Sequence, residues 1–292
     1  MPSLDDLKKR IKSVKSTQKI TKAMKMVAAA KLRKAQENAE KGRPYSQKMQ
    51  NIILNLTKSI NDIENAPKLL VGTGKDKTYL CVVLTADRGL CGGFNSNICK
   101  LAKTNFQKIL KEGKNLKILS VGSKGLDQIK REYGKYVIKK FSFKDKKQIS
   151  FKEAEIIGTE IINLFENNQF DKCILFYNNF KNVITQIPQA YQIIPAEIKS
   201  SEPKNESSLS YEFEPEEDEI LEDLLPKNIS IQVFKAFLEN AASEQGSRMT
   251  AMDNATRNAG DLVDKLTISY NRSRQASITK ELIEIISGAE SL

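Results

Sequence analysis

Residues 4–31 read LDDLKKRIKSVKSTQKITKAMKMVAAAK, and this stretch decides what the first part of the chain can become. Its first apolar positions follow the 3-4-3 spacing of a coiled-coil seam at Leu4, Leu7, Ile11 and Val14. The phase then shifts, as an inserted stutter would produce, to Ile20, Met24 and Val27. Three alanines follow at 28–30, where small side chains allow a neighbouring backbone to come close. The stretch therefore predicts a long helix that packs against a second helix.

Both ends of the chain share this helical character. Between residues 4 and 63 the only proline is Pro44, close to Gly42, and there we expect a break or kink because proline lacks an amide donor and clashes one turn back. Residues 228–286 contain no proline and carry an alanine stripe at Ala251, Ala255 and Ala259. A helix of about 57 residues would be ~85 Å long and unstable alone. We therefore expect the two ends to pair as a long antiparallel coiled coil.

The middle of the chain alternates apolar strands with amphipathic helices. We expect strands at Tyr79–Thr85, Leu116–Val121 and Lys172–Tyr177, and an extended stretch at Val183–Ile194. We expect helices at Asn95–Lys111, Gly125–Tyr133 and Phe151–Asn167. This alternation predicts βαβ units. The predicted fold class is α/β, with a central Rossmann-like α/β domain beside the coiled coil of the terminal helices.

Shifts in composition predict four parts of the chain. Residues 1–64 form the N-terminal helix of the coiled coil, 65–198 the central α/β domain, 199–225 an acidic connection, and 226–292 the C-terminal helix. The connection is marked by its charge, because residues 202–223 hold ten acidic residues against Lys204 alone.

The net charge of +11 is concentrated at the N-terminus, where residues 1–43 hold thirteen Lys and Arg against four acids. A basic helix is compatible with a nucleic-acid-binding protein or an acidic lipid surface. Few aromatic residues lie among these lysines to stack on bases, so a solvated or partner-facing surface is the favoured interpretation.

Composition also excludes several kinds of site. The chain has no histidine, which rules out a Ser-His-Asp triad and any histidine-bearing metal site. The four cysteines, Cys81, Cys91, Cys99 and Cys173, lack C-x-x-C spacing, and we expect buried, reduced thiols. The N-terminus has no apolar secretory core, and no apolar run approaches the length of a membrane span.

The glycine-rich segments are weak candidates for catalysis. Residues 71–76, VGTGKD, lack the Ser or Thr that follows the lysine of a phosphate loop. Residues 89–93, GLCGG, lack the G-x-G-x-x-G order, and we expect Gly92 and Gly93 to allow a tight turn with positive backbone angles. Cys91 has no histidine to act as its base. We therefore expect no catalytic residue, no metal and no cofactor.

The C-terminal run 270–282, YNRSRQASITKEL, is more informative. Arg274 and Gln275 are adjacent on a long helix, and Thr279 follows Gln275 by one turn. Such a patch can make directed hydrogen bonds to acidic or carbonyl groups of a partner. On spacing alone, however, a solvated face is the favoured interpretation.

Several stretches resemble the gamma subunit of F-type ATP synthases. They are residues 11–31, IKSVKSTQKITKAMKMVAAAK; 90–95, LCGGFN; 242–245, ASEQ; and 252–288, which contains ATRNA, YNRSRQASIT and ELIEIISG. The resemblance covers essentially the whole chain and is weakest at about residues 100–170.

The resemblance implies a central rotor shaft that catalyses nothing alone. In that family the terminal helices form a left-handed antiparallel coiled coil inside a hexamer of alpha and beta subunits, and the α/β domain contacts the proteolipid c-ring and the epsilon subunit. By motif, Arg274, Gln275 and Thr279 would contact a beta-subunit loop, with Met24 and Arg248 near the same coupling region. Gly92, Gly93, Tyr211 and Glu214 would lie toward the ring and epsilon end.

The resemblance also implies a location in the cell, and two alternative functions remain to be considered. We expect a peripheral protein on the cytoplasmic face of a bacterial inner membrane, or on the matrix side if it is organellar, that couples hydrogen ion transport to ATP synthesis or hydrolysis. A basic coiled-coil nucleic-acid-binding protein is the main alternative, and a nucleotide-dependent enzyme built on the central sheet is the other.

Overall fold

A computed structural model describes residues 3–59, 67–146, 149–196 and 217–290. Two helices dominate it, α1 (Leu4–Ser59) and α6 (Glu217–Glu290). The chain divides into two compact units, which are described separately. The paired-helix unit comprises Met1–Ala30 and Arg248–Leu292, and the sheet unit comprises Lys31–Ser247. The predicted four-part division of the chain stays a prediction, apart from the boundary between the acidic connection and the C-terminal helix.

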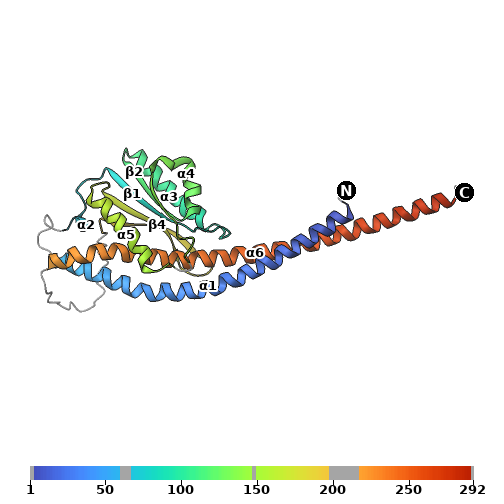
Figure 1. The fold of residues 1–292 in the computed structure, drawn as a ribbon, viewed down its shortest axis with the longest axis horizontal. Coiled ribbons are helices and arrows are strands. Elements are labelled where there is room, and N and C mark those ends of the chain that lie inside the picture. The colour runs from blue at the N-terminus through green and yellow to red at the C-terminus, as the bar shows by residue number, and fades with distance from the viewer. Residues whose placement is uncertain (1–2, 60–66, 147–148, 197–216, 291–292) are drawn as a thin grey trace. The chain divides into compact units, whose positions relative to one another are not determined.

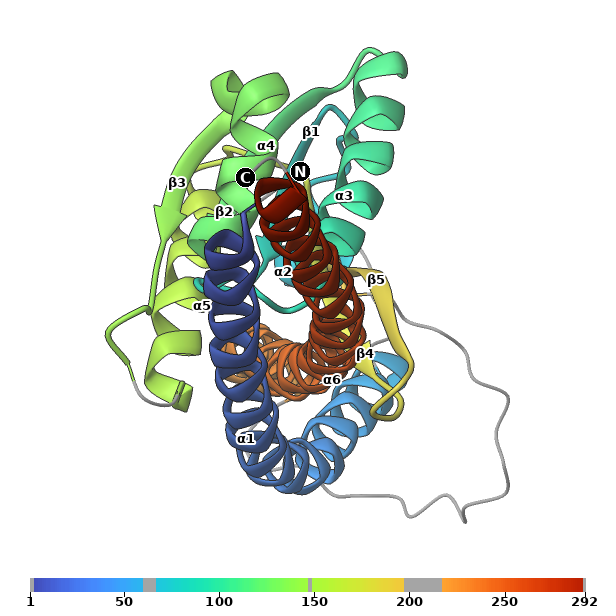
Figure 2. The same ribbon diagram turned by 90° about the vertical axis from the view of Figure 1, so that its right-hand side faces the viewer.

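The sheet unit is built on five strands in the order β3-β2-β1-β4-β5. Their bounds are β1 Thr78–Leu84, β2 Asn115–Val121, β3 Val137–Phe141, β4 Lys172–Phe180 and β5 Gln186–Ile194. The first four are parallel and β5 is antiparallel to β4. Figure 2 shows β3 and β5 at the two edges of the sheet. The predicted α/β class is confirmed. The edge strand β3 was not predicted, because its residues are half-buried or exposed and show little apolar pattern.

Helices cover both faces of this sheet, because strand side chains alternate between the faces. On one face Leu80, Val82 and Leu84 pack with α5 (Phe151–Glu166) and with Ile229, Val233 and Phe237 of α6. On the other face Cys81 and Val83 pack with α3 (Phe94–Lys111) and α4 (Ser123–Tyr133). Figure 1 shows these two layers around the sheet. A third cluster joins Ile53 and Leu56 of α1 to Leu70 of the short helix α2 (Lys68–Val71) and to Leu221 and Leu225 of α6.

Two predictions about the long helices are wrong. The first is the break at Gly42–Pro44, because α1 continues through Pro44 as one helix, while the kink that was the other expectation there stays a prediction. Contacts of the two residues that precede the proline hold this part of α1 against α6: Leu238 lies so close that a Cβ on Gly42 would meet its Cδ1 at 2.8 Å, and Arg43 binds Glu239. The second is the helix start near 226, because α6 begins at Glu217 and includes Pro226. Leu221 and Leu225 are buried against α1 and α2, and this packing extends the helix through sequence that looked like an acidic connection.

The four cysteines are free thiols and all are buried, as predicted. Burial raises the pKa of Cys99 to about 11 and raises those of Cys81 and Cys173 as well. Such thiols are poor nucleophiles at neutral pH.

Candidate functional site

The helices of the paired-helix unit run antiparallel, as the sequence predicted. A Cβ placed on Gly260 would lie 3.1 Å from Nε2 of Gln18, and the hydroxyls of Thr21 and Thr256 lie 2.8 Å apart. Lys25 Nζ donates to Asp253 Oδ1 at 2.6 Å. The partner's number falls from 260 to 253 as the position in α1 rises from 18 to 25, so the pairing is antiparallel. The bond from Lys25, together with Arg257, lowers the pKa of Asp253.

Small side chains lie in this pairing, as the alanine stripe suggested. Ala28 is 1% exposed and Ala259 is 8% exposed, whereas Ala251 and Ala255 are only half-buried. The polar contacts at Thr21, Lys25 and Thr256 were not singled out in the sequence. They could have been recognised as polar residues that occur at the helical spacing of the apolar seam. In a coiled coil, polar residues at such positions fix the register of the two helices rather than adding stability.

The same register decides where the predicted coupling residues lie. Extended along the helices, it places Leu4, the first residue of α1, opposite about residue 274 of α6. Figure 1 shows α6 continuing past the start of α1. Arg274, Gln275 and Thr279 are exposed on this run, and the Thr279 hydroxyl donates to the Gln275 carbonyl at 3.0 Å.

Met24 and Arg248 belong to a different level of the same unit. Both are half-buried. Met24 is paired with α6 near residue 254, about twenty residues and ~30 Å along the helix from Arg274. The structure therefore separates the five residues into two groups, one at the free end of α6 and one within the helix pair.

The free end of α6 carries an apolar stripe that no described residue covers. Its members recur at helical spacing and are between 49% and 68% exposed: Ile278, Leu282, Ile283, Ile285 and Ile286. A contiguous exposed apolar face of this kind marks an interaction surface. The charged and amide groups of Arg274 and Gln275 precede this stripe and can orient a partner by hydrogen bonds.

The segment 90–95, which leads into the first turn of α3, is ordered by its own side chains. Asn95 Oδ1 accepts from the Ala86 amide at 2.9 Å, and its Nδ2 lies 3.3 Å from Cys91 Sγ. Gly92 has φ +55°, as predicted, but Gly93 has φ −81° and caps α3, so that part of the prediction is wrong. The positive angle falls instead on Leu90, at φ +62°, which is 64% exposed. Tyr211 and Glu214 lie outside the described residues.

A buried polar cluster joins α6 to the sheet. Asn240 Nδ2 donates to the Leu84 carbonyl at 3.0 Å, and its Oδ1 accepts from the Asn178 amide at 2.8 Å. One side chain thus satisfies the last carbonyl of β1 and an amide of β4, just beyond the point where the two strands cease to pair. Ser243, within the 242–245 motif, donates to the Asn178 carbonyl at 3.3 Å.

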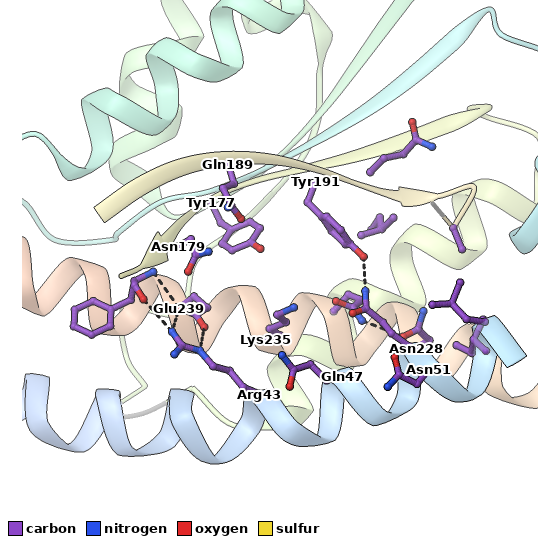
Figure 3. A pocket seen from close by; sticks show the side chains of 18 of the residues that line it. Arg43, Gln47, Asn51, Tyr177, Asn179, Gln189, Tyr191, Asn228, Lys235 and Glu239 are labelled. Atoms are coloured by element: carbon purple, nitrogen blue, oxygen red, sulfur yellow. Dashed lines mark hydrogen bonds and ion pairs between the residues drawn. The ribbon is translucent and has the colours of Figure 1, made fainter. Parts of the chain in front are cut away.

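The adjacent Glu239 extends this cluster to α1. Its carboxylate is 4% exposed and accepts from Arg43 Nε at 2.7 Å, Arg43 Nη2 at 3.0 Å and the Phe180 amide at 3.0 Å, as Figure 3 shows. The bond to Glu239 raises the pKa of Arg43. One carboxylate therefore ties both long helices and β4 together within the sheet unit. The signal in the sequence was an acid, Glu239, and an amide, Asn240, following directly on the apolar Phe237 and Leu238.

The described residues show neither a metal site nor a membrane span. No group of three or more Cys, Asp or Glu in them is placed to hold a metal ion. Among the described helices, none is both long enough and apolar enough to cross a membrane.

Relatives of known identity match the whole chain. A profile of the ATP synthase family matches residues 3–292. An ATP synthase gamma chain from Pelagibacter ubique (strain HTCC1062) is 72% identical over 292 residues, covering 100% of both chains. An ATP synthase gamma chain from Rhizobium etli (strain CIAT 652) is 56% identical over 294 residues, again covering 100% of both.

Solved structures agree with these relatives. A chain of the central stalk and c-ring structure of the Tetrahymena thermophila mitochondrial ATP synthase is 28% identical with a TM-score of 0.58, covering 81% of this chain and 99% of that one. A chain from the Euglena gracilis mitochondrial ATP synthase shares the fold, with a TM-score of 0.65 at 20% identity, covering 99% of this chain and 94% of that one. The chain therefore belongs to the family of gamma subunits of F-type ATP synthases.

Proposed function

We propose that this chain is the central rotor shaft of an F-type ATP synthase and transmits rotation of the proton-driven ring to the catalytic subunits. The observation that carries the proposal is full-length similarity to ATP synthase gamma chains, at 72% identity for the Pelagibacter relative. The central-stalk relative supports the same role. A nucleic-acid-binding coiled coil gains no support from any of these relatives.

The partners we propose are the alpha and beta subunits, the epsilon subunit and the proteolipid c-ring. The exposed apolar stripe at the end of α6 suits a position inside the hexamer of alpha and beta subunits, where contact with these subunits would remove the stripe from water. The basic residues of the segment 1–43 suit an electrostatic contact with acidic loops at the base of this hexamer. The chain would then be peripheral to the membrane, on the cytoplasmic face of a bacterial inner membrane.

The roles that we propose for single residues come from the family resemblance, and the exposure of the residues in the paired-helix unit supports them. Arg274, Gln275 and Thr279 are exposed where α6 has no helical partner, so we assign them contacts to a beta-subunit loop. Met24 and Arg248 would lie at a second level of contact. Gly92, Gly93, Tyr211 and Glu214 would face the ring and epsilon end. The chain would supply no catalytic group, and ATP chemistry would belong to the partner subunits.

Assembly is the first test. Native mass spectrometry of the full chain mixed with candidate alpha and beta subunits should give one copy per hexamer, and ATPase activity should appear in the complex rather than in the chain alone. No complex, or ATP turnover by the isolated chain, would refute the shaft function.

The coupling residues are tested in the assembled enzyme in membrane vesicles. Arg274→Ala should lower ATP-driven proton pumping roughly tenfold, because a charge-assisted hydrogen bond contributes about 1.5–3 kcal/mol. Lys265→Ala is the matched control, since Lys265 is also an exposed cation on α6 and has no proposed role. Met24→Lys should lower the number of protons pumped per ATP by adding an ionic contact. Equal pumping by Arg274→Ala and Lys265→Ala enzymes would contradict the assignment.

A further inference from the structure

The sheet unit contains a cleft of about 790 Å³ between α1, the β4–β5 hairpin and α6. Its roof is one face of the hairpin, where Tyr177 is opposite Gln189 and Leu175 is opposite Tyr191 in the strand register. Figure 3 shows Gln47 and Asn51 of α1 and Lys235 of α6 on the other sides. The volume is in the range of sites that hold a small organic molecule.

The charge of the cleft is unbalanced. Its lining holds three cationic side chains, Arg43, Lys181 and Lys235, and one anionic side chain, Glu239. Arg43 and Glu239 neutralise each other through the 2.7 Å ion pair. Lys181 is exposed to solvent, whereas Lys235 is half-buried. The surplus positive charge inside the cleft therefore belongs to Lys235.

Lys235 has neither an ion pair nor a hydrogen bond to any residue that the structure describes. Figure 3 shows its side chain projecting from α6 into the space below the hairpin. Burial lowers its pKa, and the nearby Arg43 adds to this effect, while Glu239 opposes it. A half-buried ammonium without a counter-ion is costly, and an anion in the cleft would remove that cost.

The remaining walls fit the rest of such a ligand. Asn179 and Gln189 are half-buried, and their side-chain amides have no hydrogen-bond partner within the described part of the chain. Ile53, Leu54 and Ile193 supply apolar surface. We propose that this cleft binds a small organic anion, with Lys235 as the counter-ion of its carboxylate or phosphate, the amides orienting it and the aliphatic side chains covering its apolar body.

Equilibrium dialysis of the full-length chain tests the site with four probes: benzoate, phenyl phosphate, inorganic phosphate and neutral benzamide. Binding of benzoate or phenyl phosphate, with at least tenfold weaker binding of benzamide, is expected. Lys235→Met should weaken anion binding at least tenfold, Lys235→Arg should retain it, and Lys227→Met is the control. Lys227 lies on the same helix, paired with Asp223 and outside the cleft.

A second measurement needs no variant and so does not depend on the folding of Lys235→Met. The bound probe should slow acylation of Lys235 by an amine-reactive reagent, with Lys227 as the internal reference read by peptide mass spectrometry. Unchanged labelling of Lys235 at saturating probe overturns the proposal. Three other results overturn it as well: benzamide binding as tightly as benzoate, binding by Lys235→Met equal to that of the parent, or no binding of either organic anion at about 10 mM, a concentration that would detect even weak, millimolar affinity.

Discussion

The bond between Arg43 and Glu239 should be a large single contribution to the stability of the sheet unit. The Glu239 carboxylate is 4% exposed and takes three hydrogen bonds, two from Arg43 and one from the Phe180 amide. Arg43→Met removes the charged partner and leaves a buried carboxylate with only the amide. Breaking a buried ion pair costs about 3–5 kcal/mol, and the 38% exposure of Arg43 reduces this to about 2–4 kcal/mol.

The companion substitutions separate charge from hydrogen bonding. Glu239→Gln keeps an acceptor for the Phe180 amide but loses the charge, and it should cost about 1–2 kcal/mol. Because the two side chains act together, the double variant Arg43→Met/Glu239→Gln should cost less than the sum of the single variants, by about 1–3 kcal/mol.

The assay is urea unfolding of the full-length chain followed by circular dichroism, with the free energy of unfolding taken at constant slope. Arg33→Met is the matched control, because Arg33 pairs with Glu37 at 3.5 Å on the same helix but both are exposed, and it should cost under about 0.5 kcal/mol. A cost for Arg43→Met no larger than that of the control, or strict additivity in the double variant, would refute the reasoning.

Three further substitutions or measurements test the packing. Gly158→Ala should destabilise the chain by about 1–3 kcal/mol in the same urea assay, because the new Cβ would lie 2.3 Å from Ser230 Oγ, whereas Gly89→Ala meets nothing within 4 Å and should cost less. Glu153→Ala removes the acceptor for the Ser150 amide and should lose the capping-box contribution of about 0.5–2 kcal/mol. Hydrogen bonds from Ser150 lower the pKa of Glu153 from 4.5 to about 2, so this contribution is present above pH 4.5 and disappears as the pH falls toward 2; a difference between variant and parent that stays constant across that range would contradict it. A thiol reagent at about pH 8, close to the ordinary cysteine pKa, should leave the buried cysteines unlabelled until urea unfolds the chain. Rapid labelling of the native protein would argue against their burial.

The local sequence was sufficient for most of the elements. The strands β1, β2 and β4 and the helices α3, α4 and α5 lie within a few residues of their predicted bounds, because each has a clear apolar period. β3 was missed because an exposed edge strand has little apolar pattern to read, with burial limited to its two ends. The helix starts and stops were least predictable near Pro44 and Pro226, where distant contacts rather than propensity decide whether a helix continues.

Some features of the candidate site could likewise be predicted from the sequence, and others could not. Arg274, Gln275 and Thr279 could be chosen from sequence because their motif resembles that of the gamma-subunit family, whereas spacing alone favoured a solvated face. Their position near the start of α1, ~30 Å along the helix from Met24, could be found only from the tertiary structure. It follows from the register in which Thr21 pairs with Thr256 and Lys25 with Asp253. Neither the bond of Arg43 to Glu239 nor the surroundings of Lys235 could be predicted, because each joins residues far apart in the chain.

By itself, then, the sequence determined the α/β class, the two long terminal helices and the family, since these depend on periodicity, composition and contiguous motifs. Tertiary structure alone decided the register of the helix pair, the continuity of both helices through proline and the cleft that the half-buried Lys235 lines. The physical reason is that periodicity is a local property, whereas burial and pairing of polar groups depend on which distant residues the fold brings within hydrogen-bonding distance.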